Sequence, residues 1–269
     1  MNIDAIKKKL DSFNTQSNNQ NGERKNIFWK PSVGKQVIRV VPSKYNKDMP
    51  FTEMLFYYGI GQRVMASPLN WKAKDPIVEF TKTLRQSSDK ENWRLAKKLD
   101  PKTRIFAPIV VRGEESEGVK LWQFGKEVYE SFLQMATDDE IGDYTDVYEG
   151  RDIKLNTVGP ESTGTPYNRT TVGPSLKVTP LLEDSTLVDK LLNEQPDPLR
   201  VFKMLDFDEI KSNLQSYLSP EEQTEGTISS EPVEKFDDQP KPNYSLSDAP
   251  AKKSNSDKFE DLFKDDNPF

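Results

Sequence analysis

The sequence predicts an α+β protein whose core is a small β-barrel with helical insertions. Two observations favour this class. At least six short segments are rich in β-branched residues and bounded by turn residues, and short amphipathic stretches with helical spacing lie between them. The chain has 269 residues, of which 34% are hydrophobic, and this is enough for one sizeable core plus tails or for two small domains. The number of strands alone does not separate an OB-like barrel from other α+β sheets.

The expected strands are short and follow one another closely along the chain. Lys35–Pro42 (KQVIRVVP) is typical of them because β-branched residues dominate it. Strands are expected at residues 35–42, 50–58, 104–112, 119–124, 151–159 and 175–180. The third and fourth flank a polar turn and therefore predict a hairpin. The stretch 160–174 is rich in Gly, Pro and Thr and is expected to be a loop.

The expected helices are recognised by their apolar spacing and by their first residues. They are placed at residues 76–86, 89–98, 125–136, 185–193 and 206–218. Ser88-Asp89-Lys90-Glu91 offers an N-cap with an acidic residue in the first turn, and Asp206-Phe207-Asp208-Glu209 reads as a capping box. In the last helix, Ile210, Leu214 and Leu218 lie on one face.

The N-terminal end predicts an arm rather than part of the core. Apolar residues recur there at spacings of three and four, as on one face of a short helix, while three consecutive lysines lie across the other faces. So short a helix is marginal in water without a partner surface, whether that surface is its own domain or another molecule. The residues of this arm that are candidates for such a contact are Ile3, Ile6, Lys7, Lys8, Lys9 and Leu10.

The domain organisation follows from composition. Residues 1–25 are expected to be a basic N-terminal arm and residues 26–218 the core. Residues 219–269 are rich in Ser, Pro, Glu and Asp, and this composition predicts a disordered acidic tail. Its tip, residues 257–269, is either a solubilising terminus or a docking peptide. The docking candidates are Phe259, Leu262, Phe263, Asp265, Asp266, Pro268 and Phe269.

The charge is unevenly distributed along the chain. The formal net charge is −6, but residues 1–130 hold 24 Lys and Arg against 15 Asp and Glu, a net charge of +9. Residues 131–219 carry −8 and residues 220–269 carry −7. A chain with this pattern can bind polyanions through its first half, and its acidic tail is a potential internal competitor for the same cationic surface.

Several classes of function are excluded or disfavoured. The chain has no Cys and no His, so disulfides, Cys/His zinc sites and His- or Cys-dependent catalytic dyads and triads are ruled out. A carboxylate-only magnesium site stays open. No dinucleotide-binding loop or Walker A motif is present, and no enzymatic activity, cofactor or metal is expected. No apolar run approaches 18 residues and no signal-peptide core is visible, so we expect a soluble intracellular protein without membrane contact.

The most informative pattern is the pairing of aromatic with basic residues. Trp71-Lys72, Trp93-Arg94 and Tyr167-Asn168-Arg169 are examples. Single-stranded nucleic acid requires this combination, because cations track the phosphates and flat rings stack on unpaired bases. Any one of these aromatics is more often a core residue. The candidate DNA-binding residues are Arg39, Lys44, Tyr57, Tyr58, Trp71, Lys72, Trp93, Arg94, Lys97, Lys98, Lys102, Arg104, Lys120, Trp122, Tyr167 and Arg169.

Two stretches resemble the single-stranded DNA-binding (helix-destabilising) proteins of T-even-like tailed phages. They are Gln36–Lys44 followed by Pro50-Phe51, and Glu117–Lys126 leading into a helix. The resemblance implies an OB-fold core with a basic, aromatic-lined cleft and an N-terminal arm for cooperative self-association along DNA. It also implies an acidic C-terminal tail that recruits replication, recombination and repair proteins and competes with DNA for the cleft.

The resemblance also assigns roles to single positions. It implies that Arg39 is a cleft arginine, that Trp93 and Trp122 stand where the family has cleft tyrosines, and that Tyr167 matches a tyrosine of the late loop. Lys97-Lys98 fall on the family's internal basic motif.

Three departures from the family pattern matter. Asp75-Pro76-Ile77-Val78 stands where the zinc-binding archetype has Cys-Pro-x-Cys. The resemblance therefore implies an inserted subdomain near residues 62–104 that is metal-free here and holds by packing. The family's arm motif is replaced by Lys7-Lys8-Lys9 on an amphipathic helix. The tip Asp265–Phe269 is more similar to the tails of bacterial single-stranded DNA-binding proteins, whose terminal Pro-Phe enters pockets on partner enzymes.

The sequence therefore predicts sequence-nonspecific, cooperative binding of single-stranded DNA during phage replication, recombination and repair, in the host cytoplasm and outside the virion. Three alternatives stay open at this point. They are an OB-fold protein–protein adaptor of the replisome, an RNA-binding translational regulator and a structural protein of the virion.

Overall fold

The structure is a computed structural model that describes residues 27–61, 64–219, 259 and 262–263. The expectations for the arm at 1–25 and for Asp265, Asp266, Pro268 and Phe269 of the tip lie outside these residues. The chain divides into two compact units. Of the described residues, 27–57, 65–73 and 101–204 form the first, here the β unit, and 58–61, 64, 74–100, 205–219, 259 and 262–263 form the second, here the helical unit.

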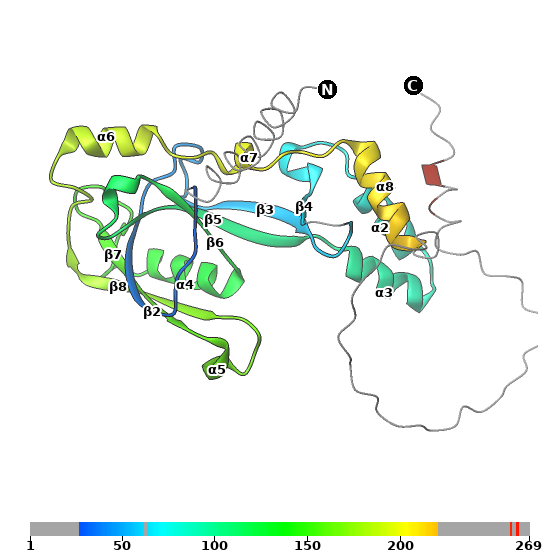
Figure 1. The fold of residues 1–269 in the computed structure, drawn as a ribbon, viewed down its shortest axis with the longest axis horizontal. Coiled ribbons are helices and arrows are strands. Elements are labelled where there is room, and N and C mark those ends of the chain that lie inside the picture. The colour runs from blue at the N-terminus through cyan, green and yellow to red at the C-terminus, as the bar shows by residue number, and fades with distance from the viewer. Residues whose placement is uncertain (1–26, 62–63, 220–258, 260–261, 264–269) are drawn as a thin grey trace, which may run out of the picture. The chain divides into compact units, whose positions relative to one another are not determined.

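The β unit is built on one eight-stranded mixed sheet (Figure 1). Its main path runs β1 (Phe28–Trp29), β6 (Lys120–Phe124), β5 (Lys102–Val111), β2 (Gly34–Val40), β7 (Arg151–Val158) and β8 (Arg169–Val178). Off this path, β3 (Thr52–Tyr57) pairs with β5 and with β4 (Met65–Ala66). The pairings are antiparallel except for β1 with β6.

The α+β class is confirmed, and a closed barrel is not. Within the described residues, β1 and β8 end the path and do not pair with each other, so the sheet is open. The predicted hairpin is present, because β5 and β6 pair from Ile105–Phe124 to Ile109–Lys120. The last strand is longer than expected. β8 starts at Arg169 instead of 175, and α5 (Pro160–Thr163) lies in the turn that joins it to β7 (Figure 1).

One face of the sheet carries the main core, which α4 (Lys126–Ala136) covers. Phe132 and Met135 of α4 pack against strand residues such as Ile38, Ile109 and Trp122. Tyr144 closes this core, and its hydroxyl donates to the Phe132 carbonyl oxygen at 3.2 Å. Burial raises the pKa of Tyr144 because the charged phenolate would lose its hydration.

Part of the opposite face is covered by the chain that follows β8. Leu181 and Val188, the latter on α6 (Ser185–Asn193), pack on Val41 and Val110 of the sheet. Three short elements complete the β unit in its described residues: η1 (Pro68–Trp71), η2 (Glu115–Glu117) and α7 (Pro198–Val201). Farther along this face, Phe106 of β5 packs against Phe202, which follows α7. Lys35, Val37 and Lys154 of β2 and β7 are exposed, and this matters for the site described below.

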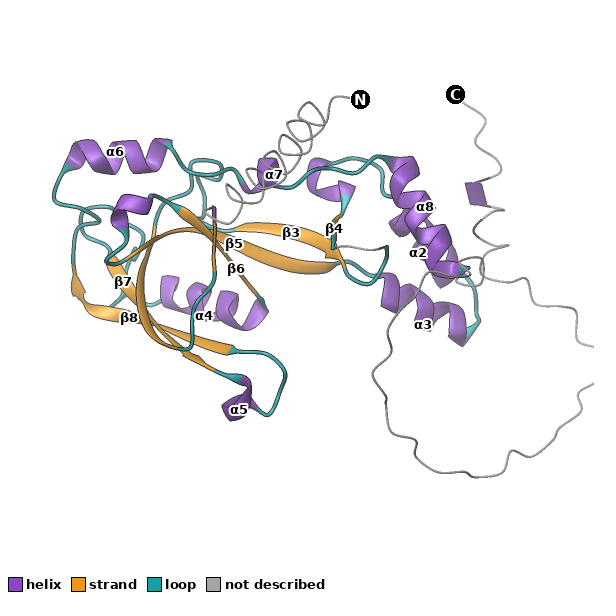
Figure 2. Cartoon of the chain, in the orientation of Figure 1, coloured by secondary structure: helices purple, strands orange, loops and turns teal. Residues whose placement is uncertain are grey.

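The helical unit contains α2 (Pro76–Gln86), α3 (Lys90–Leu99) and α8 (Phe207–Leu218), which Figure 2 shows grouped together. Each helix begins at an aspartate whose carboxylate accepts backbone hydrogen bonds. Asp75 caps α2, Asp89 caps α3 and Asp206 caps α8. The expected caps were therefore placed correctly to within one residue, since Asp89 rather than Ser88 begins α3. The predicted insertion near 62–104 overlaps this unit, which also includes α8.

Candidate nucleic-acid interface

The structure sorts the predicted DNA-binding residues by exposure. The buried residues are Arg39, Tyr57 and Trp122. Those of intermediate exposure are Tyr58, Trp71, Arg104 and Lys120. The exposed residues are Lys44, Lys72, Trp93, Arg94, Lys97, Lys98, Lys102, Tyr167 and Arg169. These three buried side chains offer no surface to DNA in this structure, and their contact with DNA stays a prediction.

Arg39 is held by an ion pair under the chain that crosses the sheet. Its side chain is 0% exposed, and its Nε lies 3.2 Å from Oδ1 of Asp152 on β7. Its Nη2 donates to the carbonyl oxygen of Thr179 and, at 3.0 Å, to that residue's hydroxyl. Because side chains alternate between the two faces of β2, Arg39 points away from the main core, as expected. On that opposite face, the chain after β8 covers it. Desolvation by this burial lowers the pKa of Arg39, and the charge of Asp152 opposes the shift.

The backbone beside Arg39 is shaped to admit the guanidinium. A Cβ on Gly150 would lie 2.6 Å from Arg39 Nη1 and would also collide with the carbonyl oxygen of Asp146. Only glycine lets the chain pass this close. Asp152 also binds Arg112, whose Nη2 lies 2.7 Å from the same Oδ1. Arg39, Asp152 and Arg112 are therefore a structural cluster that fastens the covering segment to the sheet.

Trp122 and Lys120 share one face of β6, as alternation predicts, but that face is the core side. The Trp122 ring packs edge-on to Trp29 at 5.7 Å between centroids and lies 4.8 Å from Phe124. Lys120 forms ion pairs with Glu117 and, at 3.7 Å, with Glu114. The apolar residue Phe124, two positions beyond Trp122, was the sequence signal that this stripe belongs to the core.

The helix α3 presents the combination that single-stranded nucleic acid requires. The Trp93 side chain is 53% exposed, and Lys97, one turn later, places its Nζ 5.6 Å from the centre of the ring. Lys90, Arg94 and Lys98 are also exposed on this helix. Arg94 pairs with Glu91 at 2.6 Å, but both side chains are more than half exposed, so the pair is weak. Ala96 and Leu99 face inward and anchor the helix.

The other exposed candidates are less concentrated. Lys72 follows Trp71 at the end of η1 and adopts a left-handed backbone conformation with φ 60°. Tyr167 and Arg169 lie at the β7–β8 turn, where Tyr167 is 75% exposed and Arg169 lies 3.5 Å from Glu127. Lys44 donates from Nζ to the Asn193 carbonyl oxygen at 2.8 Å, which ties it to the end of α6. Lys102 and Arg104 begin β5 in the β unit, whereas Lys90 to Lys98 belong to the helical unit.

The β unit has a cationic groove that sequence reasoning missed. Side chains of β2, β7 and β8 line a hollow of about 430 Å³ that includes Lys35, Val37, Lys154, Asn156 and Thr171. Cross-strand pairing places Asn156 between Lys35 and Thr171, and Val37 beside Lys154. No carboxylate lines this groove. The signal in the sequence was the alternation of Lys35 and Val37 on β2 and of Lys154 and Asn156 on β7, which marks one exposed face.

Comparison with known proteins agrees with this geometry. A model of the family described as gp32 DNA binding protein like matches residues 32–218, which is more than half of the chain. The chain belongs to this family. No curated protein matches the sequence. The family membership establishes single-stranded DNA binding, and the matched range includes both α3 and the groove of the β unit.

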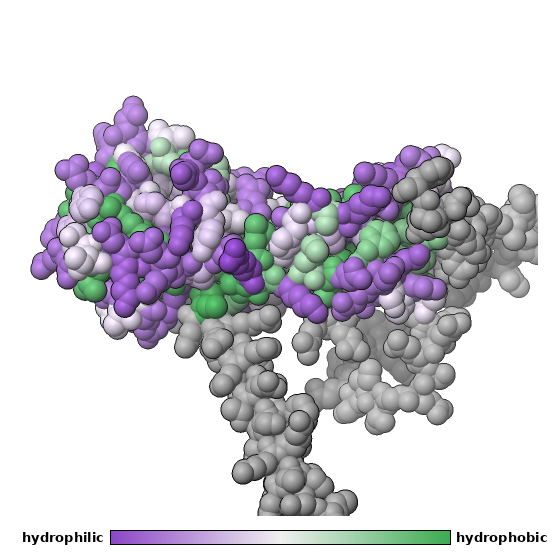
Figure 3. Space-filling view, turned by 90° about the horizontal axis from the view of Figure 1, so that it is seen from above, coloured by the Kyte–Doolittle hydropathy of each residue, from purple (hydrophilic) through white to green (hydrophobic). Residues whose placement is uncertain are grey.

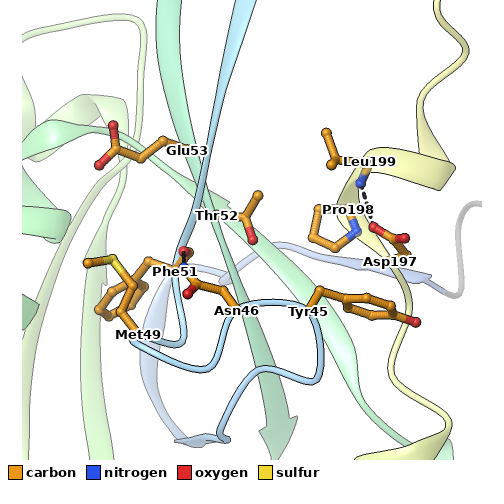
Figure 4. Close-up of a pocket in the computed structure, with 9 residues that line it drawn as sticks. All are labelled: Tyr45, Asn46, Met49, Phe51, Thr52, Glu53, Asp197, Pro198 and Leu199. Carbon is orange, nitrogen blue, oxygen red and sulfur yellow. Dashed lines mark hydrogen bonds between the residues drawn. The ribbon is translucent and has the colours of Figure 1, made fainter. Parts of the chain in front are cut away.

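A second hollow in this family member is unsuited to nucleic acid. It has a volume of about 400 Å³ and lies between the loop before β3 and α7 in the β unit (Figure 4). Two carboxylates line it, Glu53 and Asp197, and the Asp197 carboxylate accepts from Leu199 N at 2.9 Å as the cap of α7. Tyr129 donates to Glu53 at 3.0 Å. Carboxylates repel phosphates, so this hollow is a poorer candidate for a DNA surface than α3 or the groove of β2, β7 and β8.

The face drawn in Figure 3 is mostly hydrophilic, with hydrophobic residues exposed in small patches. Among the described residues, no cluster of three or more acidic side chains is placed to hold a metal ion. Asp75, in the segment compared with a zinc-binding motif, accepts hydrogen bonds from Ile77 N at 3.0 Å and Val78 N at 3.4 Å. Within the residues that the structure describes, no helix is long and apolar enough to span a bilayer.

Proposed function

We propose that this protein coats single-stranded DNA without sequence preference during phage DNA replication, recombination and repair. One observation carries the proposal. Trp93 is a large exposed aromatic on a helix whose other exposed side chains are mostly cationic, with Lys97 over its ring. An exposed tryptophan contributes nothing to a core, whereas stacking on an unpaired base contributes about 1–3 kcal/mol.

The chemistry of the two surfaces explains the lack of sequence preference. Lysine and arginine side chains on α3, and Lys35 and Lys154 in the groove, attract phosphates that every nucleotide carries. Trp93 can stack on the face of any base. Contacts with phosphates and with base faces are possible for every nucleotide, so they carry no sequence information. Binding should therefore favour unpaired strands and weaken steeply with salt.

Strand coating needs no chemical step and no nucleotide hydrolysis. A protein that binds the open strand but not the duplex shifts the melting equilibrium by mass action. This role fits the helix-destabilising activity implied by the family. We further propose that the acidic tail recruits replication and recombination proteins through its last residues, Asp265-Asp266-Asn267-Pro268-Phe269, and competes with DNA for the cationic surfaces.

Cooperativity is assigned to the N-terminal arm. Ile3, Ile6 and Leu10 form an apolar stripe in the sequence that a neighbouring copy on the strand can cover. Deleting residues 1–20 should reduce cooperativity on long poly-dT more than affinity for an oligonucleotide that holds one protein. Binding isotherms on long and short strands measure both quantities. Equal cooperativity with and without the arm would contradict this assignment.

Tryptophan fluorescence tests the central proposal, because the four tryptophans differ in exposure. Trp29 and Trp122 are buried, Trp71 is intermediate and Trp93 is exposed. Titration with oligo-dT should quench the emission of the wild type, and most of this quenching should be lost in Trp93→Phe. Trp29→Phe serves as the matched control and should retain it. Duplex of equal length should cause little quenching.

The same titration separates the alternatives. Tighter binding of a structured RNA than of oligo-dT would favour the translational regulator. Unchanged DNA affinity after Trp93→Ala and Lys97→Gln together would show that α3 is not the interface. The groove of β2, β7 and β8 would then be the remaining candidate surface, and the variants described in the Discussion test it directly.

A further inference from the structure

Three apolar residues near the C-terminus are packed against the folded chain. Phe259, Leu262 and Phe263 are helical, and their spacing of three and four places them on one face. The Phe259 side chain is only 1% exposed, and Leu262 and Phe263 are partly buried. The intervening residues Glu260 and Asp261 are acidic. Such burial in an otherwise polar segment requires a complementary apolar surface.

That surface is formed by α2 and α8 within the helical unit. The Phe259 ring lies edge-on to Phe80 of α2, with 5.6 Å between centroids and an interplanar angle of 81°. Phe263 lies 4.9 Å from Phe259 and 6.0 Å from Phe207, the first residue of α8. The Nζ of Lys211, one turn into α8, lies 4.5 Å from the centre of the Phe263 ring. The contacts therefore form a continuous aromatic row with a cation at one end.

The row belongs to the core of the helical unit. Phe80 is 0% exposed and lies on the same face of α2 as Ile77 and Leu84, which are also buried. Aromatic pairs with this edge-on geometry gain attraction beyond the burial of their area. Phe259 is thus among the largest fully buried side chains of the chain, although 39 residues separate it from Ser219, the last described residue after α8.

We propose that Phe259, Leu262 and Phe263 are an internal anchor that docks the C-terminal end of the chain onto the α2–α8 surface. This changes the expectation from the sequence, in which the same three residues dock onto other proteins. Their apolar faces are occupied within the chain. Only the residues after Phe263 are then offered to partner proteins, and a partner that takes Phe259 or Phe263 must first release the anchor. The inference is independent of how the protein binds DNA.

The occupant is the chain's own segment rather than that of a second copy. A tether of this length keeps the segment at a local concentration of the order of millimolar near its own surface. Free protein at micromolar concentration cannot compete with that. The anchor also ties both ends of residues 220–258, a stretch with nine acidic and five basic residues, to one unit.

Hydrogen exchange on the full-length protein tests the anchor. Phe259→Ala combined with Phe263→Ala should accelerate the exchange of amides in α2 and α8 by at least about tenfold, because Phe80 loses its cover. Phe236→Ala is the matched control, since Phe236 is another tail phenylalanine followed by two aspartates. It should leave the rates unchanged, and strands β2 and β7 should keep their rates in both variants. Equal exchange of α2 and α8 in all three proteins, or an acceleration shared equally by the β unit, would overturn the proposal.

Crosslinking identifies the occupant. Phe259 is replaced by the photoreactive benzoyl-phenylalanine in a mixture of full-length chains of normal and heavy isotopic composition. Irradiation should join residue 259 to peptides of α2 or α8, and nearly all products should carry a single isotopic label. Products with mixed labels at close to half of the total would assign the surface to a second copy. Absence of any product with α2 or α8 would refute the anchor itself.

Discussion

The carboxylate of Asp152 forms ion pairs with two arginines, the buried Arg39 and the partly exposed Arg112. Removing one partner of a buried ion pair leaves the other charge without compensation, which typically costs about 3–5 kcal/mol. Asp152→Ala should therefore lower the free energy of unfolding by roughly 3 kcal/mol or more. Arg112, being partly exposed, should contribute little to this loss.

Urea denaturation measures the effect, and an exposed pair provides the control. Arg85 and Asp100 lie 2.5 Å apart, but both side chains are about two-fifths exposed. Arg85→Ala should therefore change the stability by less than about 1 kcal/mol. Similar decreases in the free energy of unfolding for Asp152→Ala and Arg85→Ala would show that the Arg39 cluster does not hold the covering segment on the sheet.

Lys72 is the one non-glycine residue with positive φ in the described part of the chain, and its conformation opposes stability. Glycine relieves the strain of a left-handed conformation, and Lys72→Gly should raise the free energy of unfolding by about 0.5–1 kcal/mol. If Lys72 contacts a phosphate, the same variant should bind oligo-dT more weakly, with a salt slope smaller by about 0.7. Stability and DNA affinity would thus move in opposite directions.

Lys72→Arg is the control for this pair of effects, because it keeps both the charge and the strained conformation. It should resemble the wild type in thermal unfolding and in DNA titration at several salt concentrations. A variant Lys72→Gly with unchanged DNA affinity would remove Lys72 from the interface. The strained backbone conformation of Lys72 would then not be explained by a contact with DNA.

Among the elements, the groove of β2, β7 and β8 gives the sharpest prediction. Each lysine that neutralises a phosphate of a single strand contributes about 0.7 to the slope of log affinity against log salt. Lys35→Gln with Lys154→Gln should therefore reduce the slope by about 1.4. Titrations with oligo-dT at four or more salt concentrations give the slope directly.

The control for the groove carries the same change in net charge elsewhere in the β unit. Lys126 and Lys190 are exposed lysines on α4 and α6, away from the residues that line the groove. Glutamine at both positions should lower the slope far less than the groove variant does. Equal effects from the two pairs would mean that the groove has no special role and that only total charge matters.

How far the sequence predicts each element depends on whether local chemistry decides it. The helix α2 begins and ends where its pattern predicts, because Asp75, Pro76 and the stripe Ile77, Phe80 and Leu84 are local signals. The strand β8 was placed too late, since Gly173 and Pro174 read as loop residues. Both are tolerated because, in the described residues, β8 pairs only with β7 and is an edge strand.

The candidate site was less predictable because burial is decided by distant parts of the chain. Alternation placed Arg39 on the outer side of β2, and this was correct. The segment that covers Arg39 includes Thr179, which lies 140 residues later in the chain. No sequence pattern near Arg39 could therefore predict this burial. Trp93 was predictable, because the outer face of α3 is polar in the sequence around it. The exposure of a side chain could therefore be predicted on a helix that packs through one face only. It could not be predicted on strands, because both faces of a sheet can be covered.

At the scale of the whole chain, the first 130 residues carry a charge of +9 and the last 50 carry −7. An acidic tail tethered to cationic surfaces raises the local concentration of competing carboxylates, and salt screens this competition. Two truncations separate the contributions of the tail. Ending the chain after Phe263 keeps the anchor and removes six residues with a net charge of −1, whereas ending it after Ser219 removes the full −7.

Removal of all residues after Ser219 should raise the affinity for oligo-dT by roughly tenfold at low salt, and the gain should vanish near 0.5 M salt. Removal of only the last six residues should leave the DNA affinity within about twofold of wild type, while abolishing the capture of partner proteins that read the Pro-Phe end. Fluorescence titration measures the first quantity and pull-down from infected cells the second. Equal affinities for all three chains at low salt would show that the tail does not compete with DNA. A short truncation that raises affinity as much as the long one would instead place the competitor in the last six residues.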